Sequence, residues 1–277
     1  MLAVVVLMMF INWGIEARKW QVQMKPLERM SLIRAIKSVF AGCSITFITP
    51  NRVGEYAGRI LFVTEGNRAR AIPLTIVGGM SQLLVTLIMG IAGLMILRYV
   101  HHVYADAASI PYWLVESFLL WFSVGLAVIL ALAYVYVDAL VQRMERFAWL
   151  KPVVRYITVL HSLNRKQLLR ILVLSFFRYL VFILQYVLLL QVTGVDVAFE
   201  ISFWVISVFY LLMAIAPTIG FVELPIRALA SVELFAPYSQ NVLGIQAAAL
   251  GIWVINLVIP AIIGSLLVFG IKILKDK

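Results

Sequence analysis

Long apolar runs without charged side chains dominate the pattern along this chain. Four runs contain no Asp, Glu, Lys or Arg and reach the roughly 20 residues that a helix needs to cross a bilayer. They are Ile72–Leu97, Ser117–Val137, Ile201–Val222 and Val242–Ile271. A fifth run, Ile171–Gln191, is broken only by Arg178. The pattern predicts an all-α integral membrane protein, and a composition of 64% hydrophobic and 13% charged residues supports the same class.

Basic residues gather next to these runs, in the segments Arg18–Lys37, Arg143–Arg170 and Lys272–Lys277. Positive loops beside membrane helices mark the cytoplasmic side and face anionic headgroups. Membrane orientation therefore explains the net charge of +10, and no nucleic-acid partner is expected. Threading the chain by this rule, with Met1–Ile15 entering from outside as a short first helix, predicts about five to six spanning helices.

Two apolar segments, Ser38–Val63 and Ile201–Ala236, are interrupted near their middle by proline and glycine. The first begins and ends beside cytoplasmic charge, and the second begins and ends beside loops assigned to the outside. An odd number of crossings by either segment would break the charge pattern. We therefore expect two re-entrant helical hairpins, with each non-helical turn buried in protein or lining a cavity.

The two interruptions resemble each other, since each has a proline, a glycine, a glutamate and, four residues later, an arginine. The members are Pro50, Gly54, Glu55 and Arg59 in the first and Pro217, Gly220, Glu223 and Arg227 in the second. Paired broken segments that enter from opposite faces predict an inverted repeat around a central site. We expect one transmembrane domain, with repeat 1 at about 1–137, a basic amphipathic connector at 138–170 and repeat 2 at about 171–277.

The residue types at the interruptions suit an anionic ligand. A proline suits the first turn of a helix, so each returning arm would present a positive helix N-terminus at mid-membrane. Arginine adds a planar fork that matches phosphate oxygens, and the glutamate on the same helix face balances its charge. We expect these residues to bind substrate: Pro50, Asn51, Arg52, Gly54, Glu55, Arg59, Pro217, Gly220, Glu223 and Arg227. Alternatively, the two glutamate–arginine pairs are ion pairs that only stabilise the fold.

The stretch Thr49-Pro50-Asn51-Arg52-Val53-Gly54-Glu55, followed by Arg59, resembles the signature of the lysylphosphatidylglycerol synthase transmembrane-region family, the flippase-like membrane proteins. The resemblance extends over nearly the whole chain, although the family often has more glycines where this chain has Thr218 and Ile219. It implies translocation of an anionic-headgroup lipid, linked to aminoacylated phosphatidylglycerol or to polyprenyl phosphate, by a multi-pass protein of the plasma (inner) membrane. Some members carry a soluble aminoacyl-transferase domain, and we do not expect that activity of these 277 residues.

Two other functions fit the same residues. A membrane transferase acting on a polyprenyl phosphate would need a positioned acid, base or metal near the phosphate, and a structural subunit of an envelope-assembly complex would use the charges only for stability. No nucleotide or hydrolase motif is visible and Cys43 is the only cysteine, so we expect neither a cofactor nor a cysteine metal site. Transport rather than an enzyme is favoured, with Glu55 and Glu223 as candidate proton carriers.

Two features leave alternatives open, and a third predicts a local irregularity. Arg178 lies about two turns inside its helix, and either it reaches back to the cytoplasmic interface or it lines the path of a headgroup. The connector 138–170 either holds anionic headgroups near an entry gate or only fixes the topology. Asn256 and Pro260 predict a kink whose freed backbone groups are satisfied locally.

Overall fold

The computed structural model describes all residues except 47–48, 50–53, 105–111, 216–222 and 276–277. Every regular element among the described residues is helical, so the all-α prediction is confirmed for them. The longer helices are α1 (Leu2–Met24), α2 (Leu32–Thr46), α4 (Arg68–Tyr104), α5 (Tyr112–Val135), α8 (Arg165–Val192), α9 (Phe199–Ile215), α10 (Glu223–Phe235), α11 (Val242–Trp253) and α12 (Ile259–Lys275). The shorter ones are α3 (Gly54–Ile60), α6 (Val137–Glu145) and α7 (Lys151–Ile157), with 3-10 turns at Glu65–Asn67, Ala148–Leu150 and Thr158–Ser162.

Four helical stretches in the described part of the chain are long and apolar enough to cross a membrane. They are Glu65–Tyr99, Glu116–Val135, Arg165–Val192 and Val242–Phe269. Helix α9 is also apolar, but its 17 residues fall short of a bilayer crossing. These helices fit the integral membrane class, whereas the predicted count of five to six spans stays a prediction.

Helix α1 is longer than the sequence suggested. We expected a short helix over Met1–Ile15, but the helix continues to Met24 and reaches about 35 Å at 1.5 Å per residue. The expected boundary was wrong because Glu16 and Lys19 are not surface charges. Both side chains are buried and pair with each other at 2.8 Å, so the helix continues past them inside the protein.

Helices α2 and α3 pack against each other in antiparallel directions. At Gly58 a Cβ atom would lie 2.2 Å from the backbone oxygen of Ala41, so only glycine allows this approach. Near the open end, Arg34 Nε donates to the carbonyl oxygen of Phe62 at 2.7 Å. Helix α2 has 15 residues and is therefore about 22 Å long, shorter than the hydrocarbon core of a bilayer. The pair has the shape of a helical hairpin, and its re-entry into a membrane stays a prediction.

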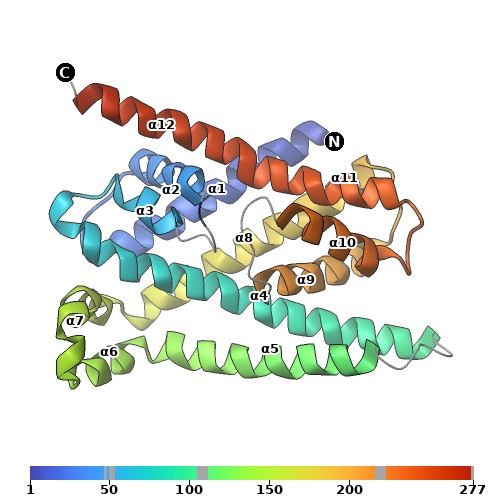
Figure 1. Ribbon diagram of the computed structural model, residues 1–277, viewed down its shortest axis with the longest axis horizontal. Helices are drawn as coiled ribbons and strands as arrows, with labels where there is room; N and C mark the ends of the chain where they lie inside the picture. The colour runs from blue at the N-terminus through green and yellow to red at the C-terminus, as the bar shows by residue number, and fades with distance from the viewer. Residues whose placement is uncertain (47–48, 50–53, 105–111, 216–222, 276–277) are drawn as a thin grey trace.

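Besides α2 with α3, three helix pairs make the most extensive contacts: α1 with α8, α2 with α12, and α4 with α9. Glycines allow two of these approaches, because a Cβ atom at Gly264 would lie 1.9 Å from the backbone oxygen of Phe40 and one at Gly90 would lie 2.5 Å from the side chain of Leu211. Helix α5 runs along α4 at the edge of the molecule (Figure 1). Its Phe118 and Trp121 side chains are each 71% exposed, as expected for a lipid-facing helix.

The last membrane stretch has the local irregularity that its sequence predicts. A π-helical turn over Val254–Val258 joins α11 to α12 immediately before Pro260. Asn256 Nδ2 donates to the carbonyl oxygen of Ile252 at 3.2 Å and to Gln185 Oε1 at 2.8 Å. Polar satisfaction at this irregularity is therefore confirmed.

The connector is a set of short helical pieces. Helix α6 ends at Glu145, and α7 begins at Lys151. Pro152 stands in the first turn of α7, where a missing amide hydrogen costs nothing. Figure 1 shows α6 and α7 close together between the ends of α5 and α8.

Candidate functional site

A stripe of polar residues runs along one face of α1. Asn12, Glu16, Lys19 and Gln23 follow one another at steps of four, three and four residues, which places them on the same side of a helix. All four side chains are buried. Ionised groups inside a membrane helix are costly, so they need partners of opposite charge.

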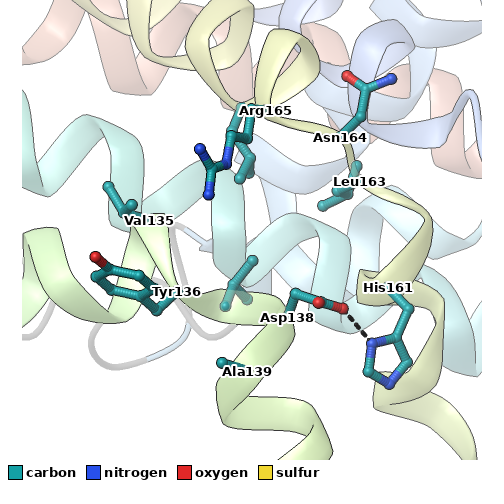
Figure 2. Close-up of a pocket in the computed structure, with 10 residues that line it drawn as sticks. Val135, Tyr136, Asp138, Ala139, His161, Leu163, Asn164 and Arg165 are labelled. Carbon is teal, nitrogen blue, oxygen red and sulfur yellow. Dashed lines mark hydrogen bonds and ion pairs between the residues drawn. The ribbon is translucent and has the colours of Figure 1, made fainter.

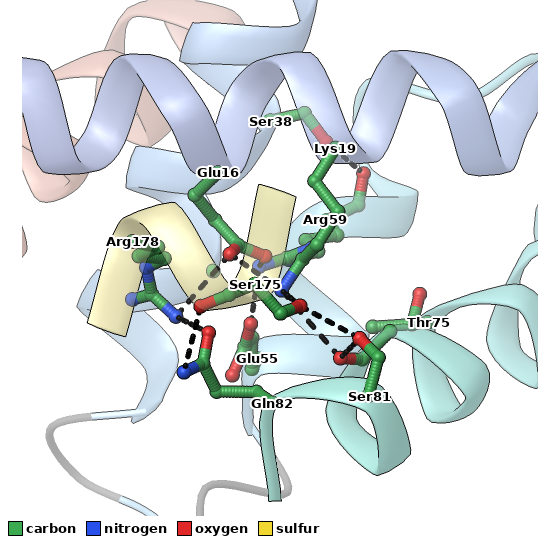
Figure 3. A network of polar contacts seen from close by, with 12 residues as sticks. Glu16, Lys19, Ser38, Glu55, Arg59, Thr75, Ser81, Gln82, Ser175 and Arg178 are labelled. Carbon is green, nitrogen blue, oxygen red and sulfur yellow. Dashed lines mark hydrogen bonds and ion pairs between the residues drawn. The ribbon is translucent and has the colours of Figure 1, made fainter. Parts of the chain in front are cut away.

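Glu16 is the centre of a buried ion-pair cluster (Figure 3). Its Oε1 atom accepts a hydrogen bond from Arg59 Nη2 at 2.7 Å. Its Oε2 atom pairs with Lys19 Nζ at 2.8 Å and with Arg178 Nη1 at 3.2 Å. One carboxylate therefore holds three cationic side chains, which come from α1, α3 and α8.

Arg59 connects this cluster to the first sequence interruption. Its Nη2 atom also pairs with Glu55, one helical turn earlier on α3. The guanidinium lies 5.4 Å from the ring centroid of Trp20, and its Nε atom has no hydrogen-bond partner among the described residues. The Arg59 side chain is 2% exposed whereas that of Glu55 is 32% exposed. Glu55 therefore forms the accessible rim of the cluster.

The cluster has more basic side chains than acidic ones. Its cations are Lys19, Arg59 and Arg178, and its carboxylates are Glu16 and Glu55. With all five groups ionised, the described cluster has a net charge of +1. An unpaired positive charge in a low-dielectric interior favours the binding of an anion.

Arg178 points into the protein, which decides against the alternative that its side chain reaches back to the cytoplasmic interface. Its Nε atom donates to Asn12 Oδ1 at 3.0 Å, and its Nη1 atom donates to Gln82 Oε1 at 3.3 Å. The guanidinium also lies 5.0 Å from the ring centroid of Trp13 and 5.1 Å from that of Phe182. Arg178 therefore belongs to the buried cluster and does not reach back to the cytoplasmic interface.

A chain of side-chain amides extends the polar network from Asn12. Asn12 Nδ2 donates to Asn256 Oδ1 at 3.1 Å, and Asn256 in turn donates to Gln185 at 2.8 Å. Gln185 Nε2 donates to the backbone oxygen of Val5 at 2.7 Å. Together with the charged cluster, these groups line α1 from Val5 to Lys19. The polar path covers about 21 Å at 1.5 Å per residue, which is most of a bilayer core.

The second interruption has a simpler environment. Arg227 Nε donates to Glu223 Oε1 at 2.7 Å, and the two side chains are largely buried. The guanidinium lies 5.7 Å from the ring centroid of Phe209, whose ring meets that of Tyr186 at 5.6 Å. No polar contact among the described residues joins this pair to Arg59, and Figure 1 shows α3 and α10 well apart along the molecule. The pair is electrically neutral and lies among aromatic rings.

The predicted site residues fall into two groups. The described ones are Gly54, Glu55, Arg59, Glu223 and Arg227. Gly54 begins α3, where its amide donates to Thr49 Oγ1 at 2.8 Å and a Cβ atom would lie 2.4 Å from the backbone oxygen of Ile45. The others, Pro50, Asn51, Arg52, Pro217 and Gly220, lie outside the described residues. Whether the two interruptions meet thus stays a prediction.

Our sequence reasoning missed the residues at the centre of the cluster. Glu16 was passed over and Lys19 was assigned to a cytoplasmic basic segment, because the first helix was expected to end at Ile15. The spacing of Asn12, Glu16, Lys19 and Gln23 on one helix face was the signal that would have identified them. In the described part of the chain, no group of three or more His, Cys, Asp or Glu side chains is arranged so that it could hold a metal ion.

Comparison with known protein families identifies this architecture. The family model of the lysylphosphatidylglycerol synthase TM region matches residues 1–264. Comparisons with curated proteins and with solved structures find no match.

Proposed function

Since the chain belongs to the lysylphosphatidylglycerol synthase TM-region family and is thus an integral membrane protein that acts on lipids, we propose that it moves an anionic lipid between the two leaflets. The cargo is a lipid with an anionic headgroup or one linked to polyprenyl phosphate. The headgroup phosphate binds at the Glu16 cluster. The localisation that goes with this function is the plasma (inner) membrane, with a multi-pass topology.

The observation that carries the proposal is the convergence of Lys19, Arg59 and Arg178 on Glu16. If these charges only stabilised the fold, equal numbers of each sign would be the least costly arrangement. With all five groups ionised, the described cluster instead has one positive charge in excess. A phosphodiester carries one negative charge at neutral pH and would complete the balance.

Glu55 is the group that a phosphate would replace. It is the most exposed carboxylate of the cluster, and it shares Arg59 with Glu16. A phosphate that displaced it would meet Nη2 and the unpartnered Nε atom of Arg59. These two donors form one edge of the planar guanidinium and match two phosphate oxygens. Glu55, once released, is also a candidate proton carrier, and Glu223 is its counterpart in the second half.

The packing of the helices supports an inverted repeat around this site. The first hairpin arm, α2, packs on α12, and the corresponding arm of the second half, α9, packs on α4. The first helix of each half, α1 and α8, pack against each other. The hairpin arm of each half thus packs against a helix of the other half. Such packing is expected for two related repeats that form one shared site between them.

Leaflet exchange in liposomes tests the proposal. The purified chain is reconstituted with a labelled phosphatidylglycerol or with labelled phosphatidylcholine, and exchange is followed for wild type, Lys19→Gln and Arg18→Gln. Arg18 is the matched control because it neighbours Lys19 on α1 but is exposed. We expect Lys19→Gln to slow phosphatidylglycerol exchange by about tenfold or more, while Arg18→Gln keeps the wild-type rate. Equal rates for both variants, each folded normally, would remove the cluster from the transport path.

A further inference from the structure

A cavity of about 480 Å³ opens on the connector, where α5 bends into α6 beside the first turn of α8 (Figure 2). Its lining comes from the end of α5 and the start of α6, with Tyr136, Asp138 and Ala139, and from the chain that leads into α8, with His161, Leu163, Arg165 and Leu168. The cavity uses none of the charged residues of the Glu16 cluster. It is therefore a separate feature of the molecule.

The position of the cavity relative to the membrane follows from its two helices. The apolar stretch of α5 ends at Val135, and that of α8 begins at Arg165, so the cavity lies at the ends of both. The connector has seven Lys or Arg residues against two carboxylates, Asp138 and Glu145. This excess assigns the cavity to the cytoplasmic headgroup level.

Hydrogen bonds fix the walls of the cavity. The Tyr134 hydroxyl donates to the carbonyl oxygen of Leu168 at 2.8 Å and ties the end of α5 to α8. Asn164 and Gln167 form a capping box that begins α8 and fixes the backbone beside Arg165. The cavity is therefore a built feature between two anchored helix ends.

Both carboxylates of the connector are hydrogen-bonded to one histidine. His161 is hydrogen-bonded to Asp138, as Figure 2 shows, and its Nε2 atom lies 3.0 Å from Glu145 Oε1. These two bonds raise the pKa of His161 above its ordinary value and favour its charged form. The carboxylates thus have a partner of their own, and neither forms an ion pair with Arg165.

Arg165 has no hydrogen-bond or ion-pair partner among the described residues, although it lines the cavity. Figure 2 shows its guanidinium turned away from the Asp138–His161 pair. The lining around it is mixed: Leu163 and Leu168 are buried apolar side chains, and the polar ones include the paired Asp138 and His161. A free guanidinium beside apolar side chains matches a ligand with a phosphate joined to hydrocarbon.

We propose that this cavity binds the headgroup phosphate of an anionic phospholipid of the cytoplasmic leaflet, with Arg165 as its phosphate ligand. The occupant is a lipid because the cavity lies at the membrane end of α5, whose outward side chains are apolar and exposed. Its glycerol and first chain carbons lie against the apolar side chains of the lining. The site is independent of the transport function proposed above, since the two share no residue.

Photolabelling tests the site directly. The full chain in phosphatidylcholine liposomes receives a small fraction of phosphatidylglycerol with a photoreactive headgroup, and labelled peptides from residues 135–140 and 161–168 are quantified. We expect Arg165→Gln to lower labelling by about tenfold and Lys166→Gln, an exposed neighbour of equal charge that does not line the cavity, to leave it within about twofold. Ala139→Phe, which fills the cavity without changing charge, should also lower labelling.

Two results would overturn the proposal. Equal losses in Arg165→Gln and Lys166→Gln would show that lipid collects on a diffuse basic surface rather than in the cavity. Competition by inorganic phosphate as effective as that by unlabelled phosphatidylglycerol would assign the site to a soluble phosphate compound. Arg59→Gln separates the two proposals, because it should keep full labelling of these peptides while it slows leaflet exchange.

Discussion

The two halves of the molecule contain the same local motif in different surroundings. In each half a helix that follows a break carries a glutamate and, one turn later, an arginine that pairs with it. Arg59 also contacts Glu16 and shares that carboxylate with Lys19 and Arg178. Arg227 instead lies over Phe209, in a cluster of aromatic rings that includes Tyr186.

The difference between the halves shows what decides the chemistry of such a motif. Spacing of four residues on a helix is enough to form the ion pair in both halves. The neighbouring helix then decides whether the pair is neutral or part of a charged site. In the first half, α1 supplies Glu16 and Lys19, and with all its groups ionised the described cluster has one positive charge in excess. We infer that the first half recognises the anion and that the second half holds a neutral pair in reserve.

The largest effect is expected from removing the shared carboxylate. Glu16→Gln leaves three buried cations with Glu55 as their one remaining carboxylate among the described residues, and such a loss costs about 3–5 kcal/mol of unfolding free energy. The matched control is Glu233→Gln, because Glu233 is an exposed carboxylate on α10. Thermal unfolding in detergent measures both. A Glu16→Gln protein as stable as the control would show that the cluster is not held together as described.

The next comparison sets the two arginines against each other. Arg59→Gln should slow phosphatidylglycerol exchange by about a hundredfold, since it removes a buried, charge-paired ligand. Arg227→Gln should slow it by about tenfold or less, because its pair is neutral. Liposome exchange rates, with folding checked by size exclusion, measure the ratio. A larger loss from Arg227→Gln would reverse the assignment of roles to the two halves.

Glycine substitutions sharpen the comparison at the level of packing. A Cβ atom at Gly264 would meet the backbone of Phe40, which cannot move aside, so Gly264→Ala should destabilise by about 1–3 kcal/mol. At Gly90 the nearest atom is Leu211 Cβ at 2.5 Å, farther than the 1.9 Å at Gly264, so Gly90→Ala should cost less. Gly125→Ala is the control, because no atom lies within 4 Å of its Cβ position. Equal costs at all three positions in unfolding measurements would contradict the close helix approaches.

The smallest effect concerns the connector between the halves. The hydrogen bonds of His161 to Asp138 and Glu145 raise its pKa, so the folded state binds the proton more tightly than the unfolded state does. This contribution is fully present below the unfolded pKa and is lost as the pH rises through the raised folded pKa. We expect about 0.5 kcal/mol or less at this exposed site. The unfolding free energies of wild type and His161→Gln should become equal at pH values above the raised pKa of His161. A difference in unfolding free energy that grows as the pH rises would contradict this prediction.

Features that depend on local sequence pattern could be predicted from the sequence alone. The apolar runs identify the helices that carry the membrane stretches, and the i,i+4 spacing identifies both glutamate–arginine pairs. It did not lead us to Glu16, because a glutamate followed by Arg18 and Lys19 has the composition of a loop. Only tertiary contacts from α3 and α8 make that position internal. Arg178 was undecided for the same reason, since its partners Asn12 and Gln82 are distant in sequence.

The distance between the lipid phosphorus and the guanidinium nitrogens of Arg59 tests the central claim most directly. Phosphorus–nitrogen dipolar recoupling by solid-state NMR, on nitrogen-15 arginine-labelled protein in phosphatidylglycerol liposomes, reads such contacts. Arg34, which pairs with Glu28 near the hairpin base, supplies the control variant. We predict a contact of about 4 Å, typical of an arginine–phosphate pair, that disappears in Arg59→Gln and persists in Arg34→Gln. A phosphorus signal that does not change when Arg59 is replaced would contradict the account.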